Sequence, residues 1–139
     1  MVLVQQLRNA ISRGLSREIA VFLLVGGTSA VLYVMLGVFF TVVFGFRPSL
    51  AIAATLAILV PPTYLAQRTL TFRANGPHVR EFPRYVITQM VGNLLAMVFS
   101  ELAPGVIKSQ PWLFFSLIAI TVAVANYSLL KLWTFRPVK

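Results

Sequence analysis

The chain has 139 residues, of which 58% are hydrophobic and 11% are charged, and it carries a net charge of +9 with no cysteine. Soluble domains contain about 25% charged residues and disordered chains are poor in apolar ones, so both classes are excluded. The absence of cysteine also excludes a disulfide framework. In a soluble protein the basic excess would indicate nucleic acid, but this apolar content indicates a membrane protein with no nucleic-acid partner.

Residues 1–17 are predicted to form a segment of their own. Leu3, Leu7, Ile11 and Leu15 recur every four residues, which places them along one helical face, while the arginines of this segment fall largely elsewhere. This pattern predicts an amphipathic helix that lies in the membrane interface. The alternative is a frayed tail whose periodicity arises by chance, because so short a helix is marginal by itself.

Four apolar runs divide residues 18–139, which we treat as one transmembrane domain. A bilayer core of about 30 Å needs about 20 apolar residues in a helix. The first, second and fourth runs reach this length. The third reaches it only if Glu101 lies near its far end. The first run is too long for the apolar region of a signal peptide. They predict four transmembrane helices over Ile19–Phe44, Ser49–Gln67, Tyr85–Ala103 and Trp112–Leu130.

The basic residues orient these helices. Of the twelve Lys and Arg residues, only Arg47 and Lys108 lie between helices one and two or between helices three and four. The others lie in the N-terminal segment, the central loop and the C-terminal tail, and short loops rich in Lys and Arg stay in the cytoplasm. We therefore predict that the N- and C-termini are cytoplasmic and that both hairpin tips face outward.

An internal repeat relates the two halves of the chain at an offset of 63 residues. At this offset Arg17-Glu18 aligns with Arg80-Glu81, and residues 64–73 align with 127–136, where Tyr, Thr, Phe and Arg coincide. Each repeat is a two-helix hairpin, so both copies enter the membrane in the same direction. The predicted fold is an all-α integral membrane protein built from two parallel-repeat helical hairpins.

The returning end of each hairpin resembles one of the two signature ends of the GtrA-like family. The first end carries Thr71-Phe72-Arg73, and the second carries Ala125-Asn126-Tyr127, then Lys131 and Trp133-Thr134-Phe135-Arg136. Phe22-Leu23-Leu24-Val25-Gly26-Gly27 is similar to the opening helix of that family. The resemblance covers about residues 17–137, and its specificity comes from the order and spacing of short motifs.

This resemblance implies a role in cell-envelope polysaccharide glycosylation at the bacterial cytoplasmic membrane. One implied activity is translocation of a sugar linked to a polyprenyl phosphate, such as undecaprenyl phosphate. Another is a non-transporting membrane anchor or partner of a polyprenyl-phosphate glycosyltransferase. A third reading, a small cation or drug exporter, needs an acid near mid-depth. Glu101 does not meet that need, because it is predicted near the outer interface, about 24 Å from Tyr85 along the helix.

Four cations at the cytoplasmic helix ends are candidates for binding the lipid phosphate: Arg68, Arg73, Lys131 and Arg136. Arginine binds phosphate oxygens in a bidentate manner, and the four residues occupy matching places in the two repeats. The alternative is that these residues only determine topology, because any four-helix protein with this orientation would carry them.

Polar residues within the predicted helices are candidates for the path of the sugar: Gln89, Asn93, Asn126, Tyr64 and Tyr127. Gln89 and Asn93 share a face of the third helix, which we expect to look inward because polar groups in lipid need partners. The alternative is that these amides form hydrogen bonds between helices that serve packing alone.

Two consecutive prolines, Pro61 and Pro62, are predicted to act as a hinge in the second helix. They remove two backbone donors, so the carbonyls of Ala57 and Ile58 lose their i+4 partners. Irregular backbone is tolerated in a membrane where protein or a water-filled cavity covers it. A kink that serves packing alone is the alternative.

The sequence lacks the residues that metal-binding proteins, ATPases and acid–base enzymes need. His78 is the single histidine and has no partner at metal-ligand spacing, so we expect no metal. There is no Walker A pattern, and the three glutamates form no recognisable acid–base pair, so we expect no cofactor and no enzymatic activity. Four short helices enclose little space, and we therefore expect a homo-oligomer.

Overall fold

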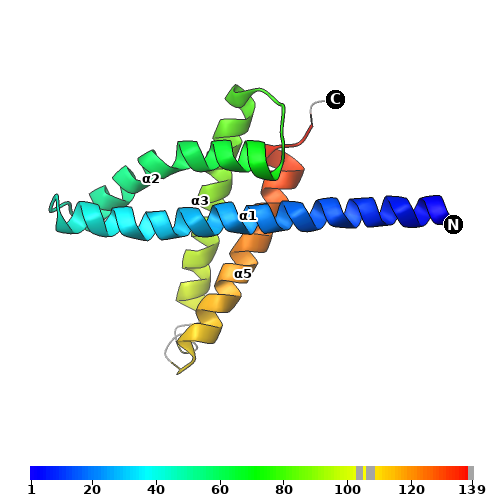
Figure 1. The fold of residues 1–139 in the computed structure, drawn as a ribbon. Helices are drawn as coiled ribbons and strands as arrows, with labels where there is room; N and C mark the ends of the chain where they lie inside the picture. The colour runs from blue at the N-terminus through cyan, green and yellow to red at the C-terminus, as the bar shows by residue number, and fades with distance from the viewer. Residues whose placement is uncertain (103–104, 106–108, 138–139) are drawn as a thin grey trace. The chain divides into compact units, whose positions relative to one another are not determined.

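A computed structural model describes residues 1–102, 105 and 109–137, without the side chains of residues 48, 49, 100, 111, 112, 114 and 115. The described chain is all α and contains no strand, as predicted. Ala103, Lys108 and Lys139 lie outside the described residues. The elements in order are α1 (Val2–Val42), α2 (Pro48–Ala66), the π-helical η1 (Gln67–Thr71), α3 (His78–Leu102), α5 (Pro111–Leu129) and the π-helical η2 (Leu130–Thr134), as Figure 1 shows.

These helices belong to two compact units, which we call unit 1 (Met1–Arg73) and unit 2 (Ala74–Lys139). In unit 1, α1 packs against α2 and η1, and in unit 2, α3 packs against α5 and η2. Each unit is therefore a helical hairpin whose second helix ends in a π-helical turn. The second helices begin at Pro48 and Pro111, in both cases with proline in the first turn, where its missing N–H costs no hydrogen bond.

Three of the described helical segments are long and apolar enough to cross a membrane: α1, Leu50–Thr71 and Ser116–Thr134. Large apolar side chains are exposed along all three, and such surfaces are stable when they face lipid rather than water. The protein is therefore a multi-pass membrane protein. Among the described residues, α3 is not one of these segments, and it carries Arg80, Arg84, Gln89 and Asn93.

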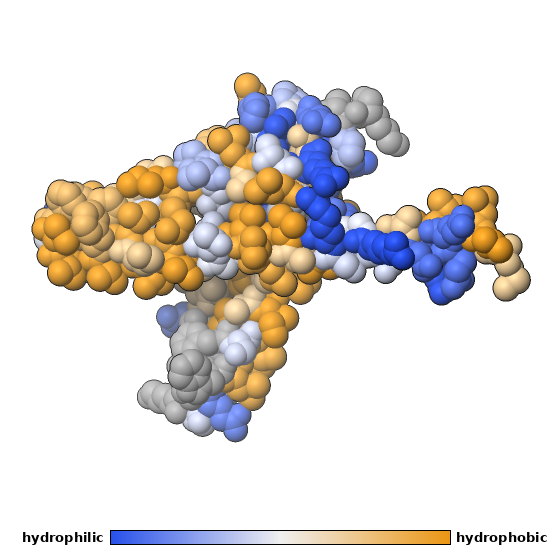
Figure 2. Space-filling model, in the orientation of Figure 1, coloured by the Kyte–Doolittle hydropathy of each residue, from blue (hydrophilic) through white to orange (hydrophobic). Residues whose placement is uncertain are grey.

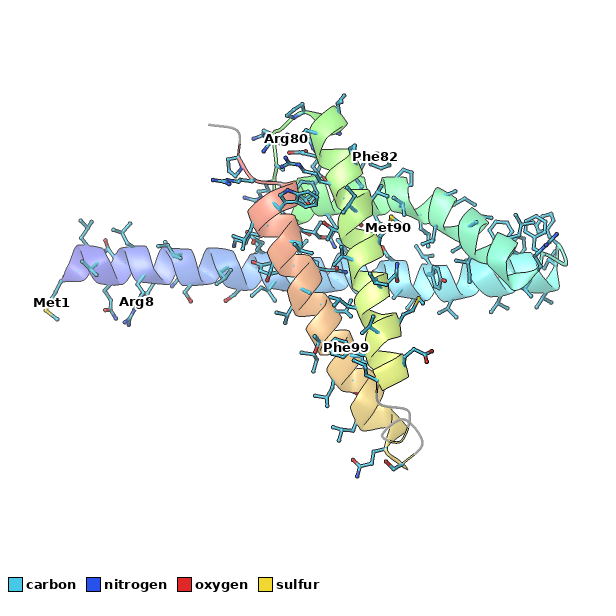
Figure 3. The ribbon with its side chains drawn as sticks, turned by 180° about the vertical axis from the view of Figure 1, so that it is seen from behind. Met1, Arg8, Arg80, Phe82, Met90 and Phe99 are labelled. Carbon is cyan, nitrogen blue, oxygen red and sulfur yellow. The ribbon has the colours of Figure 1, made fainter. Side chains whose placement is uncertain are left out.

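Residues 1–17 are helical, but they are not separated from the first predicted span. They continue without a break into the rest of α1, which has 41 residues and is therefore about 62 Å long, about twice the thickness of a bilayer core. Figure 3 shows Met1 and Arg8 near the free end of this helix. In Figure 2 both hydrophilic and hydrophobic residues lie on that end, whereas hydrophobic residues cover unit 1 around the α1–α2 turn.

The turn between α1 and α2 is held by aromatic packing and a glycine. The rings of Phe40 and Phe46 stack with their centroids 5.7 Å apart, and Phe44 lies beside both. Gly45 has φ +65°, a left-handed conformation that glycine adopts without steric cost. The turn therefore reverses the chain within a few residues and keeps α2 against α1.

The two prolines predicted as a hinge lie inside α2, which continues through both of them. Figure 1 shows that α2 is bent along its length. Proline at these positions deprives the carbonyls of Ala57 and Ile58 of their usual donors and crowds the preceding turn, which bends a helix without ending it. Both proline rings are exposed on the surface of the chain.

Candidate functional site

The second helix of each unit ends in the same unusual way. The backbone N–H of Phe72 donates to the carbonyl oxygen of Gln67 at 3.0 Å, and that of Phe135 donates to Leu130 at 2.8 Å. Both bonds join residues five apart, as in a π-helix, and η1 and η2 begin 63 residues apart, the offset of the sequence repeat. No sequence pattern predicts these turns. Short π-helical turns occur frequently at functional sites.

An arginine from the first helix of each unit binds the end of that turn. The Nη2 of Arg17 donates to the carbonyl oxygen of Leu70 at 3.3 Å, and the Nη1 of Arg84 donates to that of Trp133 at 3.0 Å. These acceptors are again 63 residues apart, and both belong to the last turn of a helix, where carbonyls lack intrahelical donors. The Arg84 guanidinium also lies 5.1 Å from the centroid of the Trp133 ring.

Neither arginine is a site candidate from the sequence, where both serve only as topology signals. The repeat alignment pairs Arg17 with Arg80, whereas the residue that performs the same contact in unit 2 is Arg84, one helical turn further along α3. The alignment by itself could therefore not have identified the second donor. The position of α3 beside η2 in the structure identifies Arg84 as that donor.

The four cations predicted to bind phosphate lie at these same helix ends. Arg68 and Lys131 are the second residues of η1 and η2, and both are half-buried. The Lys131 Nζ donates to the Tyr127 hydroxyl at 3.2 Å and lies 5.5 Å from the centre of its ring. Arg73 and Arg136 follow the turns and are exposed. Arg73 has φ +49°, a left-handed conformation typical of the residue just after a helix.

In unit 1 a buried chain of hydrogen bonds ties η1 to α1. The Thr71 hydroxyl donates to the Gln67 Oε1 at 2.6 Å, and the Gln67 Nε2 donates to the carbonyl oxygen of Phe22 at 3.4 Å. Gln67 is 3% exposed and Thr71 is 2% exposed. Because polar groups buried at membrane depth need partners, these bonds determine how η1 sits against α1.

In unit 2 a different set of side chains makes the corresponding connection. The Thr88 hydroxyl donates to the carbonyl oxygen of Arg84 at 2.9 Å and lies 3.1 Å from the Thr134 hydroxyl. A hydroxyl has one hydrogen, so Thr134 is the donor in this second bond. Tyr85 is buried beside Phe135, with their ring centroids 6.5 Å apart. Thr71 and Thr134 thus hold equivalent turns through different partners.

The side of α3 that packs within unit 2 includes Tyr85 and, further along the helix, the residues just before Gln89 and Asn93. Asn93 is exposed and Gln89 is half-buried, while Tyr85, Thr88 and Gly92 are buried, and each of these three meets a residue of α5, η2 or the turn after η2. Asn93 therefore takes no part in the packing within unit 2. Small side chains allow the close approach of α5, and this packing outweighs the tendency of the amide to find a partner.

Of the three remaining residues predicted along the sugar path, Tyr64 is 3% exposed and Tyr127 is half-buried against Lys131. Asn126 is half-buried in α5 and faces Gly92 of α3. The Asn126 Oδ1 is buried and has no hydrogen-bond partner. The structure therefore brings Asn126 and Tyr127 to the end of unit 2 that carries Lys131, and it leaves one amide oxygen unsatisfied there.

Unit 1 has two open grooves between α1 and α2. One has a volume of about 230 Å³ and includes Ser29, Pro62 and Thr63 in its lining. The other has a volume of about 200 Å³ and includes Tyr33, Gly37 and Thr55. Ser29 and Thr63 share a hydrogen bond of 2.9 Å. Pro62 thus lines a groove that also contains the hydrogen-bonded Ser29 and Thr63 side chains.

The candidate site consists of cations, amides and hydroxyls. Among the described residues, no three His, Cys, Asp or Glu side chains lie close enough together to hold a metal ion. His78 is exposed at the start of α3. The chemistry available at these helix ends is positive charge and hydrogen bonding, which suits an anionic head group that carries hydroxyls.

Fold and site together define a class of protein: a small, multi-pass, all-α membrane protein with a repeated hairpin and a basic end on each hairpin. The family described as GtrA/DPMS, transmembrane domain, matches residues 21–135, which include both π-helical turns and all of the helices except the first part of α1. The chain therefore belongs to this family, and the predicted resemblance is confirmed. Membership indicates a part in the handling of lipid-linked sugars. No curated protein and no solved structure matches the chain.

Proposed function

We propose that this protein translocates a polyprenyl-phosphate-linked sugar across the bacterial cytoplasmic membrane for glycosylation of cell-envelope polysaccharide. In this proposal all four long helices cross the membrane, both termini are cytoplasmic, and a homo-oligomer encloses the path. The role requires no catalytic group and no cofactor. Membership of the GtrA/DPMS transmembrane family supports the substrate class.

The observation that carries the proposal is the matched basic end of the two units. A half-buried cation follows the first residue of each π-helical turn, Arg68 in η1 and Lys131 in η2, and an exposed arginine follows each turn, Arg73 and Arg136. A cation in such a position binds phosphate more strongly than one in open water, because less solvent screens it. Each unit therefore has the groups that an anionic head group needs at the cytoplasmic surface.

The sugar path of the proposal begins one turn deeper in the same helices. Tyr64 and Tyr127 precede η1 and η2, and Asn126 lies beside Tyr127 with an unsatisfied oxygen. Gln89 is half-buried on α3 and can extend this path, and Asn93 is exposed on the surface of unit 2, where it is available to a ligand or to another helix. Pro61 and Pro62 give α2 a bend at which its cytoplasmic half can move.

The test is reconstitution of purified protein into proteoliposomes with a labelled polyprenyl-phosphate-sugar, followed by its appearance in the opposite leaflet. Arg68→Gln with Lys131→Gln should reduce translocation at least about tenfold, since each lost cation–phosphate bond is worth about 1.5–3 kcal/mol. Arg8→Gln with Arg13→Gln removes the same charge from the exposed start of α1 and is the matched control. Equal activity of the two double variants would contradict the proposal.

One observation favours a second candidate, a non-transporting anchor or partner of a polyprenyl-phosphate glycosyltransferase. Leu3, Leu7 and Ile11 form an apolar stripe on α1 and are 69%, 56% and 69% exposed. A helix that extends past the bilayer core with such a stripe can pack against an enzyme at the membrane surface. Replacing the three residues with serine should then abolish association with the glycosyltransferase, while a translocator reconstituted alone would keep its activity.

A further inference from the structure

We infer that Gly92 and Asn126 form a hydrogen-bond acceptor site in unit 2 for a hydroxyl of the lipid-linked sugar. The inference rests on the proposed function for the identity of the ligand, and it deepens that proposal by assigning one group of the protein to the sugar rather than to the phosphate. It also gives Gly92 a role that the predicted site residues do not include.

The first observation is the unsatisfied oxygen. The Asn126 Oδ1 is buried and accepts no hydrogen bond, although it lies on α5 between two packed helices. Buried polar atoms are nearly always satisfied, so an orphan acceptor indicates a missing partner. Gly92, which lies against this oxygen, has no side-chain donor to offer it, and a donor supplied by a ligand would gain a bond that does not have to compete with water.

The second observation is the space that Gly92 leaves for this amide. A Cβ atom placed on Gly92 would lie 2.6 Å from the Asn126 Oδ1 and 2.9 Å from its Nδ2, which is closer than real Cβ contacts. Any other residue at position 92 would have to push the amide away. Gly92 is therefore a positioning residue that holds the Asn126 side chain against α3.

The third observation is the contrast with unit 1. At the repeat offset of 63, Gly92 corresponds to Ser29 and Asn126 corresponds to Thr63, and those two hydroxyls bond to each other at 2.9 Å. At these two positions the side chains of unit 1 form a hydrogen bond with each other. In unit 2 the side-chain oxygen of Asn126 has no donor. At these two repeat-related positions, unit 2 therefore has an unsatisfied oxygen that unit 1 lacks; elsewhere in the described part of unit 1, the buried Thr55 hydroxyl also has no partner.

The chemistry of the acceptor selects the part of the ligand that it binds. An amide oxygen accepts hydrogen bonds, and an ionised phosphate diester or monoester offers few or no donors, whereas a sugar offers several hydroxyls. Asn126 lies five residues before Lys131, about 7.5 Å along the helix. Since the sugar is bonded directly to the phosphate, a phosphate near Lys131 brings a sugar hydroxyl within reach of Asn126.

The decisive variant carries Gly92→Ser together with Asn126→Thr, which copies the closed pair of unit 1 into unit 2. Binding to the purified protein in detergent is measured for two probes, a polyprenyl-phosphate-sugar and the same polyprenyl phosphate without sugar. We expect the variant to bind the sugar-bearing lipid about fivefold to tenfold more weakly, the effect of one lost hydrogen bond, and the sugar-free lipid unchanged. Ser29→Ala with Thr63→Val removes the polar pair of unit 1 and should leave the ratio of the two affinities unchanged.

Thermal unfolding of each variant controls for loss of structure. If the double variant does not fold, Asn126→Leu, which has nearly the same shape and removes the orphan oxygen, replaces it with the same expected result. Unchanged affinity for the sugar-bearing lipid in a folded variant would overturn the inference. Wild-type protein that binds both lipids equally would also overturn it and leave phosphate docking in place. Wild-type protein that binds neither lipid would overturn the proposed function as well.

Discussion

Thr71 and Thr134 occupy equivalent positions in the two repeats, and the structure predicts that the same substitution has different effects on them. In unit 1 the Thr71 hydroxyl is the donor to the Gln67 Oε1, with a distance of 2.6 Å. In unit 2 the Thr134 hydroxyl donates to Thr88, whose own hydrogen is already bonded to the carbonyl oxygen of Arg84. Thr→Val keeps the shape of the side chain and removes only its hydroxyl.

The expected magnitudes follow from what each substitution leaves unsatisfied. Thr71→Val leaves a buried amide oxygen of Gln67 without a donor, which costs about 1–3 kcal/mol. Thr134→Val removes one hydroxyl–hydroxyl bond, about 0.6 kcal/mol for a typical bond between membrane helices, and Thr88 keeps its bond to Arg84. We therefore expect Thr71→Val to lower the free energy of unfolding by at least about 0.5 kcal/mol more than Thr134→Val.

The assay is equilibrium unfolding of the two single variants and the wild type in the same detergent, followed by loss of helical circular dichroism. Gln67→Leu with Thr71→Val removes both ends of the unit 1 bond and should recover part of the loss, because no orphan acceptor remains at Gln67. Equal destabilisation by Thr71→Val and Thr134→Val, or a larger effect in unit 2, would refute the assignment of donors and acceptors in the two hairpins.

Two further predictions concern the prolines and the arginines. Pro61→Ala with Pro62→Ala restores backbone donors for two carbonyls of α2. We expect this double variant to have a higher melting temperature and to translocate more slowly. A slower rate without a higher melting temperature would count against a hinge. Arg84→Gln should destabilise the protein more than Arg17→Gln by about 0.5–1 kcal/mol, because only Arg84 also lies over an aromatic ring, that of Trp133. Equal melting temperatures of those two variants would exclude that contribution.

The predicted hairpins and their repeat came from strong sequence signals. Apolar runs long enough to span a bilayer determine helices almost without regard to neighbours, because a backbone in lipid must satisfy its own hydrogen bonds. The matches between residues 64–73 and 127–136 pointed to the right ends of the right helices, where the structure has η1 and η2. The cations Arg68 and Lys131 could be found because both lie within those matches.

Other features could not be predicted, because they depend on packing between helices. Polarity alone drew attention to Gln89 and Asn93 on α3, whereas the contacts of α3 with η2 and α5 are made by Thr88 and Gly92, since small residues let helices approach. The arginine pair that caps η1 and η2 is offset by one turn between the repeats, so alignment could not identify it. α1 continues without a break past residue 17, since residues 1–17 contain no proline that would break a helix.

The sequence by itself determined that this is a basic, helical membrane protein of the GtrA/DPMS transmembrane family, because composition, run length and motif order are local properties of the chain. Tertiary structure decided which polar groups are satisfied. At the repeat-related positions 29 and 63, and 92 and 126, one pair closes on itself and the other leaves the Asn126 oxygen without a donor. That difference depends on which side chains face each other across two helices, which no single stretch of sequence contains.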